Sequence, residues 1–161
     1  MSDQKQLMVK IVMDAWNVHL ARTGKLLDQL TDEQLQNEVA PGRNTGTYLL
    51  GHLVAVHDAL SPLLGTGPKL YPQLEEPFIK QPDKSGLEKP SVKELRNYWN
   101  EVNNKLAGEL SKFSADEWLQ KHTSVSEEDF AKEPHRNRLN VLISRTNHLA
   151  YHFGQLSFLK P

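Results

Sequence analysis

Apolar side chains recur every three or four residues through most of the chain, which is the spacing of amphipathic α-helices. The clearest run predicts a helix over residues 92–112 and begins at the capping box Ser91-Val-Lys-Glu94, directly after Pro90. Its apolar face consists of Leu95, Trp99, Val102, Leu106, Leu110 and Phe113. Similar runs predict helices over residues 4–30, 46–64 and 138–158, so at least half of all residues should be helical.

The segments between these runs also carry helix signals. Thr31-Asp-Glu-Gln34 and Ser114-Ala-Asp-Glu117 predict brief helices, and Pro62 should bend or end the last turn of the 46–64 helix. Residues 65–90 form the longest connector and 121–137 the second. No β-type alternation and no 20–50-residue repeat is present. The sequence therefore predicts an all-α fold, a four-helix bundle with long connectors, in a single domain over residues 1–161.

Composition narrows the classes of function. The chain has 20 acidic and 19 basic side chains, and this net charge of -1 does not indicate the excess of positive charge that is typical of nucleic-acid-binding proteins. The absence of cysteine excludes disulfides, thiolate metal ligands and a cysteine nucleophile. No apolar run reaches the ~20 residues of a membrane span. The first residues do not resemble a signal peptide. We therefore expect a cytoplasmic protein that acts on a small molecule, not on nucleic acid or membranes.

Candidate metal ligands come from the histidines. His148 and His152 lie four residues apart, about 6 Å along a helix axis, so both imidazoles can reach one ion. The 46–64 helix offers His52 or His57, which flank its apolar stripe on opposite sides, each about 70° from the centre, so periodicity does not choose between them. Three imidazoles from two helices form the ligand set of an open catalytic-type zinc site. The alternative is that the histidines are only packed and hydrogen-bonded.

Other polar residues give weaker evidence about the candidate metal site. The residues between His148 and His152 do not form the H-E-x-x-H zinc-protease motif, and no carboxylate extends the ligand stripe. Gln155, three residues after His152, is placed to support a ligand or bound water. His19 fits a hydrogen-bonded core position in the first helix. His122 and His135 fall in connectors, where we expect them to be solvated. The catalytic residues are left unassigned.

The segments NTGTYLLGHLVAVHDAL and RTNHLAYHFGQLSFL resemble the DinB/YfiT-like superfamily of small bacterial four-helix bundles. In that family a second-helix histidine, in a pattern like W/Y-L-L-x-H-L, and two histidines in H-x-x-x-H-R-G-Q bind a divalent metal. The resemblance implies that His52, His148 and His152 are the metal ligands. His57 and Asp58 then become rim residues. Phe153 departs from the pattern, because arginine is common at its position.

This resemblance also implies a class of function. Relatives include metal-dependent hydrolase-like proteins and transferases that use low-molecular-weight thiols, so we expect one of these activities on an unknown substrate, with a thiol as one candidate. The alternative is a non-catalytic metal-binding or protein-interaction bundle. Three imidazoles accept Zn²⁺, Ni²⁺, Fe²⁺ or Cu²⁺, so the identity of the metal is open. The oligomeric state is open as well, and a homodimer is one alternative.

Overall fold

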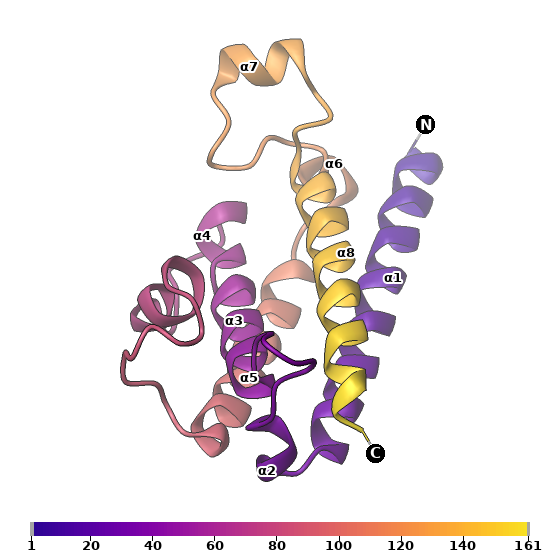
Figure 1. The fold of residues 1–161 in the computed structure, drawn as a ribbon. Coiled ribbons are helices and arrows are strands. Elements are labelled where there is room, and N and C mark those ends of the chain that lie inside the picture. The colour runs from indigo at the N-terminus through magenta and orange to yellow at the C-terminus, as the bar shows by residue number, and fades with distance from the viewer. Residues whose placement is uncertain (1, 161) are drawn as a thin grey trace.

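The computed structural model describes residues 2–160, and its long helices correspond to the four predicted ones (Figure 1). They are α1 (Ser2–Gln29), α3 (Gly46–Asp58), α5 (Val92–Leu110) and α8 (Arg138–Leu156). Helices make up 69% of the described chain, which confirms the all-α fold class and the expectation that at least half would be helical. Within residues 2–160 no strand forms, and no helix is long and apolar enough to cross a membrane.

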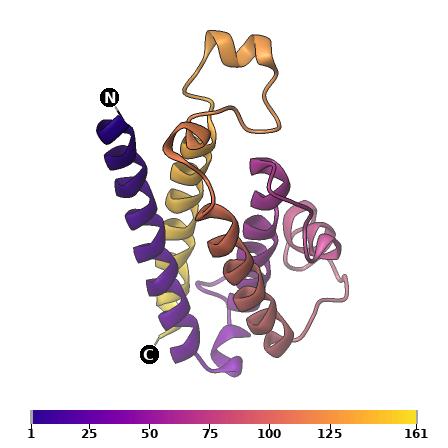
Figure 2. The same cartoon turned by 180° about the vertical axis from the view of Figure 1, so that it is seen from behind.

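The long helices form two side-by-side pairs, α1 with α8 and α3 with α5 (Figures 1 and 2). The members of each pair run parallel, and the two pairs run in opposite directions. This order requires a long crossover, because the chain leaves α4 (Leu60–Leu64) at one end of the bundle and must re-enter α5 at the other. Residues 65–90 supply that crossover along the outside of α3.

Local signals in the sequence set the helix ends. The predicted brief helices are α2 (Asp32–Leu35) and α6 (Ala115–Trp118), and both begin at complete capping boxes. A third box, Ser91 with Glu94, starts α5. The prediction for Pro62 is confirmed, because α3 ends at Asp58 and α4 continues after Ala59. Pro62 lacks an N–H, and its ring would crowd the carbonyl of Asp58 in a regular helix.

The connectors are more ordered than the sequence analysis predicted. The 65–90 segment contains η1 (Pro72–Leu74), which is 3₁₀, and η2 (Glu76–Lys80), which is π-helical, and the 121–137 segment contains α7 (Glu127–Lys132). Phe78 of η2 is fully buried against α3. Gly51 makes room for it, since a Cβ there would lie 2.2 Å from Phe78 Cε1. This close approach holds the crossover on α3.

Asp58 fastens the same crossover to the end of α3. Its Oδ1 accepts a 2.8 Å hydrogen bond from Leu70 N, and its Oδ2 accepts one of 2.7 Å from Tyr71 N. Only 1% of Asp58 is exposed. The prediction of a rim residue was therefore wrong, because the crossover folds over it and uses its carboxylate to satisfy two backbone N–H groups.

We predict that Asp58→Ala lowers the free energy of unfolding by roughly 2 kcal/mol, because two part-buried N–H groups lose their acceptor. Urea unfolding followed by circular dichroism measures the change. Asp116→Ala is the control, since Asp116 is exposed and pairs with Lys5 at the surface, and it should behave as the wild type. Equal stability of the two variants would show that Asp58 does not anchor the crossover.

His57 lies in the centre of the bundle, not at its rim. Its ring is fully buried, 5.0 Å from the ring of Trp16 and 5.2 Å from that of Trp99. Its Nδ1 donates a 2.8 Å hydrogen bond to Asn103 Oδ1, while Asn103 Nδ2 donates to Trp99 O. The rim prediction was wrong because α1 and α5 close over this flank of α3. Trp118 is also buried, as are Trp16 and Trp99.

The pKa of His57 gives the core a pH dependence. Burial lowers this pKa from 6.5 to about 4, against the hydrogen bond to Asn103 and with smaller contributions from the charges of Arg145 and His52. The unfolded chain therefore takes up a proton near pH 6.5 that the folded chain accepts only near pH 4. Stability from neutral His57 is complete above pH 6.5 and is lost as the pH falls towards 4.

We predict that His57→Asn flattens this dependence, because an amide can donate to Asn103 and does not titrate. Between pH 7 and 4.5 the wild type should lose on the order of 2–3 kcal/mol more unfolding free energy than the variant. Urea unfolding at several pH values, with chelator present throughout, measures the difference. Parallel curves for the two proteins would show that His57 does not carry the effect.

Candidate metal centre

Three imidazoles from two helices converge between the helix pairs. His52 comes from α3, and His148 and His152 come from successive turns of α8. Nε2 of His148 lies 3.1 Å from Nε2 of His52 and 3.1 Å from Nε2 of His152. One ring nitrogen from each of the three residues lies within 4.8 Å of the others. The three histidines that the family resemblance implied are thus the three that the fold brings together.

The spacing of the nitrogen atoms matches a shared cation. A nitrogen–metal distance of about 2.0–2.1 Å and a tetrahedral arrangement place neighbouring nitrogens about 3.3 Å apart. An octahedral arrangement brings them to roughly 3.0 Å at the same bond length. The separations of 3.1 Å fall between these values. The side chains therefore need little movement to hold one ion.

Hydrogen bonds on the far side of two rings direct their lone pairs inward. His52 Nδ1 lies 2.7 Å from the backbone oxygen of Phe78, and His152 Nδ1 lies 2.7 Å from Gln155 Oε1. Both oxygens only accept, so each Nδ1 carries the proton and each Nε2 presents a lone pair to the centre. This is the outer arrangement that orients metal-binding histidines. The supporting position that the sequence predicted for Gln155 is occupied as expected.

Electrostatics keeps the three rings neutral. Burial is the largest cause that lowers the pKa of each ring. For His148 the pKa falls to about 3, because the neighbouring His152 and His52 and the cation of Arg145 add to the burial. Nδ1 of His148 is also buried and has no hydrogen-bond partner. Neutral imidazoles are the form that binds a metal, and a cation relieves the repulsion between lone pairs that face one another. The residues present therefore fit a divalent ion.

Carboxylates and cysteines do not share the centre. Among residues 2–160, no aspartate or glutamate joins the group of three histidines. The side chains present thus supply three ligands, and further positions stay open to a small molecule. They supply no adjacent general base. The charged neighbour is instead Arg145, one turn before His148 on α8. No prediction from the sequence included Arg145, although its i,i+3 spacing from His148 was a readable signal.

The other histidines do not contribute ligands. His57 is buried between tryptophans, as described above. His135 is exposed as predicted, whereas His122 is half-buried. His19 is half-buried, and its buried Nδ1 has no hydrogen-bond partner, contrary to the expected hydrogen-bonded core position.

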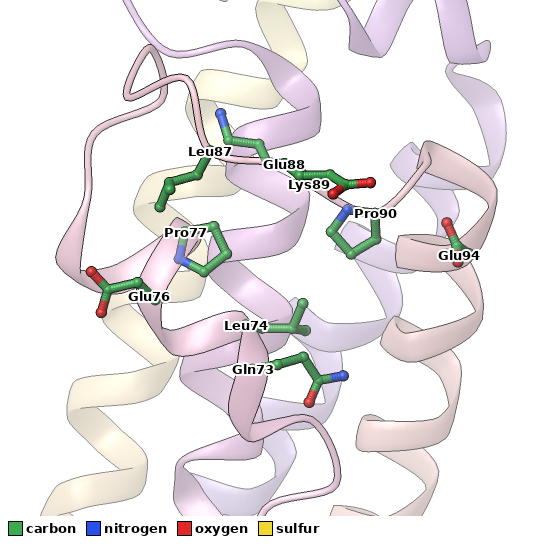
Figure 3. A pocket seen from close by; sticks show the side chains of 9 residues that line it. All are labelled: Gln73, Leu74, Glu76, Pro77, Leu87, Glu88, Lys89, Pro90 and Glu94. Atoms are coloured by element: carbon green, nitrogen blue, oxygen red, sulfur yellow. The ribbon is translucent and has the colours of Figure 1, made fainter.

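Two hollows in the surface are lined without any of the three histidines. Figure 3 shows one of 560 Å³ between η1, η2, residues 87–90 and Glu94 at the start of α5, without any histidine in its lining. A second, of 330 Å³, is lined by Val39, Ala40, Arg43, Tyr151, Gln155 and Phe158. It borders the imidazoles through Gln155, on the Nδ1 side of His152, and through Tyr151, whose ring lies 5.1 Å from that of His152. The chemistry of the three imidazoles, not the shape of these two hollows, therefore identifies the candidate metal centre.

Comparison with known proteins places this geometry in a family. Two crystal structures share the fold. A DinB-like protein from Bacillus cereus ATCC 10987 has 23% identity, a TM-score of 0.65, and coverage of 92% of this chain and 87% of that one. A conserved protein from Enterococcus faecalis has 18% identity, a TM-score of 0.62, and coverage of 93% of both chains. No functionally curated protein matches the sequence. The sequence profile of the DinB superfamily matches residues 15–156, and the chain therefore belongs to the DinB superfamily.

Proposed function

We propose that the protein binds one divalent metal ion through Nε2 of His52, His148 and His152 and uses it to activate a small thiol for transfer to an unknown acceptor. The observation that carries the proposal is the convergence of three Nε2 atoms, two of them oriented by hydrogen bonds at Nδ1. When bound, such an ion supplies Lewis acidity that lowers the pKa of a thiol or water in a remaining coordination position.

The surroundings of the histidines favour a thiol over water. A cysteine-type thiol has a pKa of about 8.5 and water one of about 15.7, so a thiol needs a much smaller shift to ionise near neutral pH. Hydrolysis gains more from a general base, and no carboxylate among residues 2–160 joins the three imidazoles. A metal-dependent hydrolase and a non-catalytic metal-binding protein are the outcomes that compete with this proposal.

The roles of the chain's own residues follow from their contacts. His52 and His152 hold their lone pairs inward because Phe78 O and Gln155 Oε1 each fix a proton on the outer nitrogen. Partial burial of all three rings limits competition from bulk water. A substrate would enter from the solvent-accessible side, since the core behind the site is filled by Trp16, His57 and Trp99.

The direct test combines metal content with thiol binding. Untagged protein purified without chelator should contain about one equivalent of a transition metal by elemental analysis. After replacement by Co²⁺, 2-mercaptoethanol should produce a sulfur-to-cobalt charge-transfer band. Metal binding without this band would overturn thiol activation and leave hydrolysis or simple binding. The absence of specific metal binding would overturn the whole proposal.

We predict that His148→Ala weakens metal binding by at least ~100-fold, because two imidazoles cannot replace three. Unfolding free energy in chelator should fall less for this variant than for Leu149→Ala, since Leu149 is fully buried in the apolar core. Competition with a chromophoric chelator gives the affinity, and thermal unfolding gives the stability.

His135→Ala is the control for that measurement, because His135 is exposed and apart from the cluster. It should keep the wild-type metal affinity. Wild-type protein that unfolds outright when the metal is removed would show a structural ion and contradict an open, catalytic-type site.

We further predict opposite outcomes for two changes at Gln155. Gln155→Leu removes the acceptor of His152 Nδ1–H and should weaken metal binding about 10–100-fold. Gln155→Glu keeps an acceptor and makes it stronger, so affinity should be equal to or higher than that of the wild type. Isothermal titration with Zn²⁺ measures both. A similar loss in both variants would mean that Gln155 acts through packing instead of through His152.

A further inference from the structure

Arg145 is the charged side chain closest in sequence to the metal ligands, and the fold gives it no counter-ion. It lies on α8 three residues before His148 and is half-buried. Its Nε is buried without an acceptor, and among residues 2–160 no carboxylate lies within ion-pair distance. Buried guanidinium groups normally have such partners, because burying an unpaired charge is unfavourable.

Other arginines in this protein show what a structural role looks like. Arg96 donates to the backbone oxygens of Leu27 and Leu30 and pairs with Asp32. Arg138 donates to the backbone oxygens of Leu64 and Glu117. Both close helix ends or loops. Arg145 makes no comparable contact, so neither a helix end nor a salt bridge explains its position.

The charge of Arg145 acts on both helices that build the site. It contributes to the lowered pKa of His148 on its own helix and of His52 and His57 on α3. With its i,i+3 spacing from His148, this indicates that the guanidinium lies beside the imidazoles and within electrostatic range of α3. A cation there opposes the binding of a divalent metal through simple Coulomb repulsion. An anion between the guanidinium and the metal ion would reduce that repulsion. It would also compensate the unfavourable free energy of burying the guanidinium without a partner.

We propose that Arg145 binds an anionic group of the substrate, so that the substrate is a small thiol carrying a carboxylate or phosphate on a short spacer. This inference rests on the proposed metal site, because the thiol is to reach the ion while its acid group reaches Arg145. Side chains at i and i+3 of a helix have Cβ atoms about 5–6 Å apart, so the spacer is only a few bonds long. The fork of N–H donors in a guanidinium matches two acceptor oxygens of one acid group.

The test compares two thiols that differ in charge. Protein loaded with Co²⁺ is titrated with 3-mercaptopropionate and with its methyl ester, and binding is followed through the sulfur-to-cobalt band. For the wild type, the acid should bind at least ~10-fold more tightly than the ester. In Arg145→Met this preference should disappear, and Arg145→Lys should keep part of it. Comparing ratios between proteins cancels the intrinsic difference between the two thiols.

A second readout needs no thiol. Without added anion, Arg145→Met should bind Co²⁺ at least ~3-fold more tightly than the wild type, because a repelling charge has been removed. Arg136→Met is the matched control: Arg136 pairs with Glu133 in the loop before α8, and its loss should change neither quantity. Melting temperatures and Co²⁺ stoichiometry establish that each variant is folded and loaded.

The outcomes separate the two proposals. If the wild type binds no Co²⁺, the metal site and this inference both fail. If it binds Co²⁺ and both thiols equally well, or if Arg145→Met keeps the wild-type preference for the acid, the anion site is wrong and the metal site stands. A preference lost in Arg145→Met and unaffected in Arg136→Met supports the assignment.

Discussion

The strictest condition on this fold is the close approach of three imidazoles, in which Nε2 of His148 lies 3.1 Å from Nε2 of both His52 and His152. Neutral nitrogens at that distance repel unless a proton or a cation lies between them. The arrangement also requires α3 and α8 to meet at one height, although these helices belong to different pairs of the bundle. An ion at this junction would connect the pairs where their direct contact is limited. The ion would then stabilise the fold by joining two helix pairs, each of which is already packed.

Much of the remaining architecture serves to hold His52 in that position. The crossover from α4 to α5 passes over α3, and Phe78 presents its backbone oxygen to His52 Nδ1. This position of the crossover depends on Gly51, whose lack of a side chain makes room for Phe78. It also depends on Asp58 at the end of α3, whose carboxylate accepts hydrogen bonds from two backbone N–H groups of the crossover. A segment rich in proline and glycine is thus part of the site. It reaches the centre through one backbone oxygen and contributes no ligand.

Periodicity in the sequence was sufficient to predict the long helices, because their apolar residues recur at helical spacing, and a capping box marks the start of α5. Periodicity was not sufficient to predict which of His52 and His57 faces α8. Both flank the apolar stripe of α3 by similar angles, and only the neighbours decide which flank faces α8 and which faces the two tryptophans. The family motif selected His52, the histidine that the fold brings together with His148 and His152, while the rim positions assigned to His57 and Asp58 were wrong. Their burial depends on α1, α5 and the crossover, which no local pattern of α3 reports.

The separation between the apolar core and the histidine cluster bears on whether the site acts as a catalyst. Trp16, His57 and Trp99 fill the centre of the bundle, where Asn103 Oδ1 accepts a hydrogen bond from His57 Nδ1. That core does not involve Nε2 of the three clustered histidines, so its packing does not require an ion. A structural site, in contrast, usually completes its ligand set from the protein and carries the folding free energy. Here the chain offers three imidazoles, and an arginine without a counter-ion lies beside them. This arrangement is expected where a small anionic molecule occupies the remaining coordination position of the metal and balances the charge of the arginine.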